Sequence, residues 1–217
     1  MGWGARRHEL ARGAKISPRA ENSLFSPYLL CGLAQVALVH HQSTVTISPL
    51  SQADGFKSTG CSNLDCTGFI PVNDYVITPG DTLDHSSGQT KISLKIFKSK
   101  DDGDWWLYFG HDINNLGRVG YWPTSLFKNL DHATTVALGG STVSYRGDSS
   151  PPMGNSQWPK KGSASVQNIQ FLDKDGQEYI PQFPVDIRDI VTHNKCYETS
   201  TFSDDMFYYG GPGDCTE

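Results

Sequence analysis

The stretch that decides the fold is KISLKIFKSKDDGDWWLYFG, residues 91–110. In its first part Ile92, Leu94 and Ile96 alternate with other residues, so they lie on one face of a β-strand. The acidic DDGD sequence at residues 101–104 then predicts a hairpin turn. The stretch is therefore predicted to be a β-hairpin whose second strand is WWLYFG, residues 105–110.

The second strand of this hairpin has large apolar residues on both faces. Because successive side chains of a strand point to opposite faces, Trp105, Leu107 and Phe109 share one face. Trp106 and Tyr108 share the other. A strand with aromatic residues on both faces is either covered on both, or lines a cleft on one.

Similar short runs of alternating apolar residues continue from Ala53 to the C-terminus. Short alternating runs are separated by Gly, Asp, Asn and Pro, the pattern of an antiparallel β-sandwich or barrel. Residues 66–73 are a further expected strand, and residues 171–180 a further hairpin with its turn at Asp175-Gly176. Residues 123–130 are the segment expected to be helical, with Pro123 near its start. The sequence predicts an all-β fold.

Length and charge exclude some classes of protein. The 217 residues suffice for one large all-β domain or two small ones. The formal net charge is −5, and lysines and arginines form no cluster. We therefore expect no nucleic-acid partner.

Four of the five cysteines fall into local pairs, Cys61 with Cys66 and Cys196 with Cys215, and Cys31 is left over. Such pairs favour two disulfides and an oxidising compartment. Reduced thiols are an alternative. Zinc is disfavoured because the spacing is unusual for zinc ligands and no histidine sits four residues from any of these cysteines.

The N-terminal segment differs from the rest. A basic start is followed by SLFSPYLLCGLAQVALV, Ser23 to Val39, whose apolar core is too short for a membrane span. It resembles a secretory leader with a long basic region, and the alternative is an ordinary buried segment. We place residues 1–52 in an atypical N-terminal segment and residues 53–217 in the β-domain.

Common catalytic motifs are absent from the sequence. There is no G-x-S-x-G, phosphate loop or dinucleotide fingerprint, so no cofactor and no metal are expected. The seven histidines are expected to be structural, although a Ser-His-Asp set scattered along the chain stays open.

Six blocks in one order carry a family resemblance from about residue 53 onward. They are TGCSNLDCTGF (59–69), GDWWLYFG (103–110), VGYWPTSLF (119–127), the Gly139-Gly140 strand, MGNSQWPKKG (153–162) and FYYGGPGDC (207–215). Together they resemble the C-terminal part of the neprosin family, secreted plant glutamic endopeptidases that cleave at proline.

The resemblance implies a β-sandwich with a peptide cleft and two catalytic glutamates. One carboxylate activates water, and the other carboxyl, kept protonated, polarises the scissile carbonyl. Two carboxyls that share a site have pKa values pushed apart, so such an enzyme works in acid. In the family, the second glutamate directly follows the Gly-Gly pair.

This sequence departs from that pattern at both glutamates. The residue after Gly139-Gly140 is Ser141, and there is no glutamate between Glu21 and Glu178. The segment upstream of Ala53 does not resemble the strand that carries the first glutamate. Leading strands of the sandwich are therefore expected to be missing or replaced, and TVTISPL at residues 44–50 is a candidate replacement.

Three hypotheses follow. The first is a non-catalytic, secreted relative that binds proline-containing peptides, with Trp106, Tyr108 and Trp122 as candidate cleft residues. The second is an acid endopeptidase that uses other carboxyls, of which Asp148 lies nearest to the Gly-Gly strand in sequence. The third is a fragment without independent activity.

Overall fold

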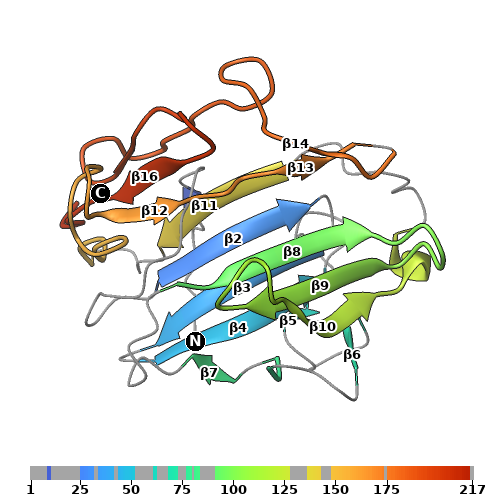
Figure 1. Ribbon diagram of the computed structural model, residues 1–217. Coiled ribbons are helices and arrows are strands. Elements are labelled where there is room, and N and C mark those ends of the chain that lie inside the picture. The colour runs from blue at the N-terminus through green and yellow to red at the C-terminus, as the bar shows by residue number, and fades with distance from the viewer. Residues whose placement is uncertain are drawn as a thin grey trace, which may run out of the picture. The chain divides into compact units, whose positions relative to one another are not determined.

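The computed structural model describes residues 9–10, 25–31, 34–41, 44–51, 61–62, 68–72, 77–79, 81–83, 91–127, 136–142, 148–173 and 175–215. These residues form strands β1 to β16 and, as the helical element among them, the short 3-10 turn η1. The prediction of an all-β fold is confirmed (Figure 1).

The strands of the first half are mostly short outside the region of residues 25–51. Their bounds are β1 (Glu9–Leu10), β2 (Phe25–Cys31), β3 (Ala34–His41), β4 (Thr44–Ser51), β5 (Cys61–Ser62), β6 (Ile70–Pro71), β7 (Thr82–Leu83), β8 (Ser93–Lys98) and β9 (Trp105–Gly110). The remaining elements are β10 (Gly117–Trp122), η1 (Thr124–Leu126), β11 (Val136–Thr142), β12 (Ala164–Val166), β13 (Phe171–Leu172), β14 (Glu178–Tyr179), β15 (Glu198–Thr199) and β16 (Phe207–Gly210).

The largest sheet has seven strands, in the order β1-β11-β2-β3-β4-β5, with β7 paired to β4. Four of them, β1, β2, β3 and β4, come from the chain upstream of Ala53. The predicted strand at residues 44–50 is confirmed as β4. Most of the apolar run from Ser23 to Val39 lies in β2 and β3, and its role as a leader stays a prediction.

The chain divides into two compact units. The C-terminal unit consists of Met1–Tyr28, Val39–Ser43 and Leu138–Glu217, and the central unit of Leu29–Leu38 and Thr44–Ala137. The predicted division at residue 52 stays a prediction. No helix among the described residues has the length and apolar character needed to cross a membrane.

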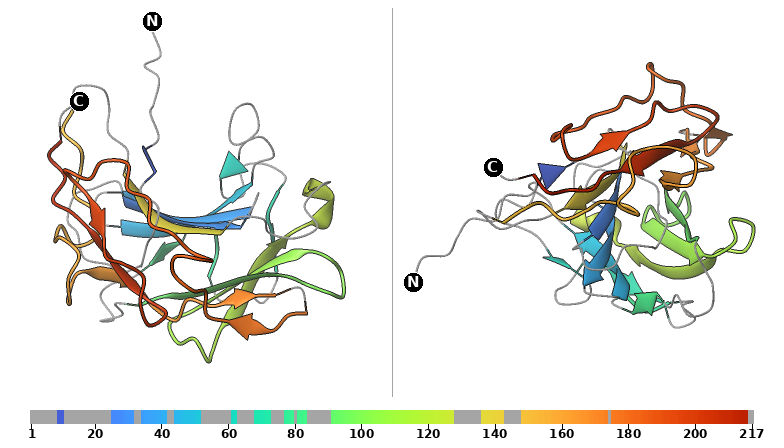
Figure 2. Two further views of the ribbon diagram at one scale, coloured as in Figure 1. Left: turned by 90° about the horizontal axis from the view of Figure 1, so that it is seen from above. Right: turned by 90° about the vertical axis from the view of Figure 1, so that its left-hand side faces the viewer.

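The central unit contains a four-stranded antiparallel sheet in the order β6-β10-β9-β8 (Figure 1). The predicted hairpin of residues 91–110 is confirmed as β8 and β9. Figure 2 shows η1 as the short helical turn directly after β10, shorter than the expected helical segment.

One face of this sheet is a close-packed apolar layer. Register places Leu94 beside Phe109, and Ile96 beside Leu107, so the predicted alternation of β8 is confirmed. The buried residues on or beside this face are Phe69, Trp105, Leu107, Phe109, Val119 and Trp122. Phe69 and Trp122 meet edge to face, with ring centroids 4.7 Å apart, an arrangement favoured by the aromatic quadrupole.

A β-bulge in β10 decides which of its residues reach that core. Arg118 pairs with Tyr108 but Gly120 pairs with Leu107, so Val119 is an extra residue in β10. A bulge reverses the alternation of all residues beyond it. Trp122 therefore shares the core face with Trp105, while Tyr121 shares the opposite face with Trp106.

The C-terminal unit contains the three-stranded sheet β12-β16-β15 and the β13-β14 hairpin. The hairpin turn predicted at Asp175-Gly176 is confirmed by the Phe171–Tyr179 pairing, and Gly176 has φ of 77°. The core of the unit gathers eight buried residues, which are Met153, Ala164, Ile169, Cys196, Tyr197, Phe202, Phe207 and Tyr209.

Candidate functional site

The face of the four-stranded sheet opposite the core carries two rows of side chains that run across the strands. The first row is Phe97–Trp106–Tyr121, and the second is Lys95–Tyr108–Arg118. We call these six residues the aromatic–cationic face. Its side chains are half-buried except that of Arg118, which is exposed.

The rings of this face lie close together. Ring centroids are 4.9 Å apart for Trp106 and Tyr121, 5.5 Å for Phe97 and Tyr108, and 6.5 Å for Trp106 and Tyr108. Two cations lie over rings, Arg118 at 5.6 Å from the Trp106 centroid and Lys95 at 5.7 Å from that of Phe97. Both distances are within the range of cation–π attraction.

Trp106 is also held by the β8–β9 turn. Its indole Nε1 donates a hydrogen bond of 3.3 Å to Asp102 Oδ2. The backbone N–H of Asp104 donates to the same carboxylate at 3.0 Å. These bonds, together with one from Ser99, keep the pKa of Asp102 below its ordinary value, with the Asp104 bond the largest cause. The turn thus fixes the ring that lies at the middle of the face.

The structure brings together two of the three candidate cleft residues. Trp106 and Tyr108 lie on the aromatic–cationic face, but Trp122 has 0% exposure and lies on the core face. Unbroken alternation along β10 would have put Tyr121 in the core and Trp122 outside. The bulge at Val119 exchanges them, so Tyr121 and not Trp122 is the β10 aromatic residue of the face.

The Gly-Gly strand is β11, as predicted, and Ser141 pairs with Leu10 of β1. Gly140 is buried against the C-terminal core, where an added Cβ would lie 2.9 Å from Met153 Sδ and 3.2 Å from Tyr209 Cε2. This close packing explains a glycine at position 140. Burial also raises the pKa of the Tyr209 hydroxyl.

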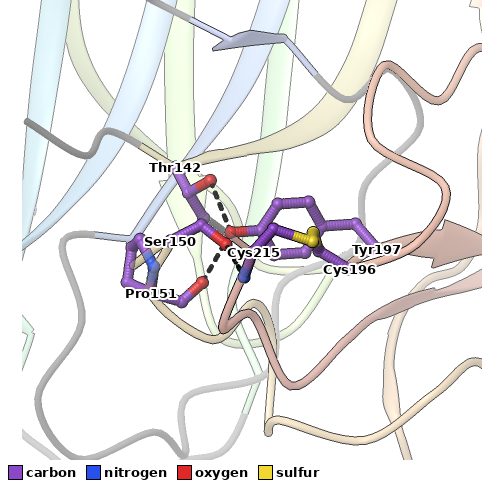
Figure 3. The surroundings of a disulfide bond; sticks show 6 residues. All are labelled: Thr142, Ser150, Pro151, Cys196, Tyr197 and Cys215. Atoms are coloured by element: carbon purple, nitrogen blue, oxygen red, sulfur yellow. Dashed lines mark hydrogen bonds between the residues drawn. A yellow bond between two sulfur atoms is a disulfide. The ribbon is translucent and has the colours of Figure 1, made fainter. Parts of the chain in front are cut away.

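A tyrosine anchors the residue that follows Ser141. The Tyr197 hydroxyl donates a hydrogen bond of 2.7 Å to the Pro151 carbonyl oxygen and accepts one of 3.0 Å from Thr142 Oγ1 (Figure 3). Beside it Cys196 and Cys215 form a disulfide with Cα atoms 5.9 Å apart, so this predicted pair is confirmed. The predicted Cys61–Cys66 bond lies outside the described residues.

Removing the Tyr197 hydroxyl should loosen this end of β11. We expect Tyr197→Phe to lower the free energy of unfolding by about 1–3 kcal/mol, because the buried Thr142 hydroxyl loses a partner. Tyr208→Phe is the matched control, since Tyr208 is half-buried on the neighbouring β16. Urea unfolding measures both, and equal effects of the two substitutions would contradict this role.

The candidate replacement carboxyl, Asp148, is exposed on the surface. Glu178 and Glu198, the two glutamates whose side chains the structure describes, are exposed as well. Asp189 is exposed, and partial desolvation by neighbouring atoms, rather than a second carboxyl, raises its pKa. A carboxyl pair that shares one proton would instead have its pKa values separated by mutual repulsion.

Residues 32–212 match the model of the Neprosin family, and the chain therefore belongs to the neprosin family. This confirms the family that the six sequence blocks indicated. The match begins upstream of Ala53, so β3 and β4 lie within it. The family match thus includes two of the four strands that lie in the segment expected to be atypical.

Proposed function

We propose that this protein is a non-catalytic member of the neprosin family that binds proline-containing peptides without cleaving them. The observation that carries the proposal is the serine at position 141, directly after Gly139-Gly140 on β11. By the family resemblance this position calls for a glutamate. The sequence also has no glutamate from residue 22 to residue 177.

A serine does not replace the missing carboxyl chemically. Its hydroxyl neither ionises near pH 4 nor acts as a strong proton donor, as a carboxyl does. General acid and base groups typically contribute about 10²–10⁴-fold each to the rate. Loss of both should leave a cleavage rate about 10⁴-fold or more below that of an intact glutamic peptidase.

The aromatic–cationic face supports the binding half of the proposal. Trp106 and Tyr108 are half-buried, which leaves part of each ring for a ligand. The hydrogen bond to Asp102 and the contact with Tyr121 hold the Trp106 ring in place before a ligand arrives. A pre-organised ring loses little conformational entropy on binding.

We also propose that the protein is secreted. The disulfide between Cys196 and Cys215 supports this location, because disulfides persist in oxidising compartments. The family resemblance gives the same expectation.

The test is a cleavage and binding assay on proline-containing peptides at acidic pH. We expect binding without products, and we expect Trp106→Ala to weaken binding by about tenfold, the order of a lost stacking contact. Heat-denatured protein is the control for contaminating peptidase. The Asp148→Ala variant tests whether the protein is instead an acid endopeptidase that uses Asp148.

Each other outcome overturns part of the proposal. Cleavage by the native protein that is lost on heating contradicts the non-catalytic assignment, and loss of that cleavage in Asp148→Ala identifies the acid endopeptidase. The absence of both binding and cleavage contradicts the peptide-binding assignment and favours a chain without independent activity.

A further inference from the structure

Arg118 brings a positive charge to the row of aromatic rings without a carboxylate partner among the described residues. It is exposed, and its guanidinium carbon lies 5.6 Å from the Trp106 ring centroid. A stacked guanidinium is pre-oriented, and its remaining N–H groups match the geometry of a carboxylate. The structure thus places an anion-binding group beside the rings assigned to proline.

The bulge brings Arg118 and Tyr121 to the same face of the sheet. Arg118 pairs with Tyr108 before the register shift at Val119, whereas Tyr121 pairs with Trp106 after it. The two rows of the face are therefore neighbours, because they are centred on Trp106 and Tyr108, which lie two residues apart on β9. The Trp106 and Tyr108 ring centroids that mark the two rows are 6.5 Å apart.

This separation matches an extended peptide. Such a chain advances about 3.3 Å per residue and presents every second side chain to one face, so neighbouring side chains on that face are about 6.6 Å apart. A peptide that runs along β9 and packs a proline on the first row would place the side chain two residues away at the second row. Arg118 stands on β10 at that second row, and its guanidinium extends from there over the Trp106 ring of the first row.

We propose that the aromatic–cationic face selects peptides in which an acidic residue is separated from proline by one residue, with Arg118 as the specificity-determining residue. This inference rests on the proposed binding of proline-containing peptides and adds the chemistry of the flanking position. Lys95, in the same row, has its ammonium 5.7 Å from the Phe97 ring centroid.

The test compares short peptides that differ at one position, measured by fluorescence anisotropy at pH 6.5, where the ligand carboxylate is ionised. The set is Pro-Ala-Glu, Pro-Ala-Gln, Pro-Glu-Ala and the reversed order Glu-Ala-Pro, each within the same Gly/Ser flanks. We expect the Pro-Ala-Glu or the Glu-Ala-Pro peptide to bind about three- to tenfold more tightly than the Gln peptide, the range expected for one charge-assisted contact near the surface.

Variants of two exposed arginines, Arg118 and Arg188, complete the comparison of peptides. In Arg118→Gln the preference for the Glu peptide over the Gln peptide should disappear. Arg188→Gln is the matched control, because Arg188 is exposed in the C-terminal unit, and the preference should persist in it. Added salt should weaken the Glu preference of the native protein.

Two kinds of result separate a failure of selectivity by Arg118 from a failure of peptide binding itself. If all peptides bind equally and Trp106→Ala weakens them all, peptide binding stands and the role of Arg118 is overturned. A Glu preference that persists in Arg118→Gln also overturns it. If no peptide binds, both proposals fall.

Discussion

Trp122→Ala should lower the free energy of unfolding of the central unit by about 3–5 kcal/mol, the usual cost of truncating a fully buried aromatic side chain. Trp122 has no exposed surface, lies beside Trp105 in register and packs its ring against Phe69. The substitution removes these contacts and leaves a cavity between β10 and its neighbours. Denaturant unfolding followed by tryptophan fluorescence measures the loss.

Trp106→Ala is the matched control for this prediction. Both residues are tryptophans paired in adjacent register positions of β9 and β10, but Trp106 is half-buried on the opposite face. Its truncation should cost less stability than that of Trp122 and should affect peptide binding instead. Equal losses of stability for the two variants would contradict the assignment of the two faces.

Trp122→Phe should separate lost packing from the indole polar group. In the described part of the chain, the Trp122 Nε1 is buried and has no hydrogen-bond partner. Replacing a buried group that has no partner incurs no loss of a hydrogen bond. We therefore expect the Phe variant to retain most of the stability that the Ala variant loses.

Removal of the C-terminal disulfide is the second large expected effect. The Cys196→Ala/Cys215→Ala variant should lose about 2–5 kcal/mol of unfolding free energy, since the bond closes a loop of sequence separation 19. It also fastens the last described residues. Near it the Ser150 N–H bonds to the Cys215 carbonyl oxygen at 3.0 Å, and the Asp214 N–H bonds to the Ser150 carbonyl oxygen at 2.8 Å.

The single variants are the control for the disulfide. Either Cys196→Ala or Cys215→Ala breaks the same bond, so each should lose about as much stability as the double variant rather than half. Thermal and urea unfolding at a protein concentration that limits intermolecular thiol exchange measure the three. The role of the bond would be contradicted if the double variant had an unfolding free energy within about 0.5 kcal/mol of that of the native protein, because ordinary surface substitutions change stability by that much.

Much of the central sheet follows from sequence because its signals are local. The β8–β9 hairpin was predicted from alternation and from the DDGD turn, and register confirms it. The position of Trp122 was not predictable in the same way. It depends on one extra residue, Val119, and an uninterrupted alternation gives no sign of a bulge. Gly120, next to it, is a weak signal, because glycines often mark bulges.

The N-terminal strands were harder to predict for a different reason. A short apolar run such as Ser23 to Val39 fits a leader or a buried strand equally well. A run that is apolar throughout lacks the alternation of polar and apolar residues that would identify a strand. The structure places most of it in β2 and β3. Such a run is identified as strands by its pairing with distant segments in the seven-stranded sheet, and no local sequence motif predicts that pairing.

In the candidate site, sequence indicated Trp106 and Tyr108 of the six residues. It missed the other four, which are Lys95, Phe97, Arg118 and Tyr121. These residues join the face only through cross-strand register. The Tyr197 hydroxyl, which links Thr142 to Pro151, also joins segments far apart in the chain. Such contacts follow from tertiary structure, whereas the substitution of serine at position 141 is visible in the sequence alone.

Whether the protein binds a proline-containing peptide and leaves it intact can be measured directly. The most direct test incubates native protein with an isotope-labelled Pro-Ala-Glu peptide at pH 4 and at pH 6.5. The bound fraction is then separated by size and its mass is measured. We expect the recovered peptide to have its full mass at both pH values, and we expect the Trp106→Ala variant to retain less of it. Recovery of fragments cut at the proline, absent from the heat-denatured sample, would contradict the claim.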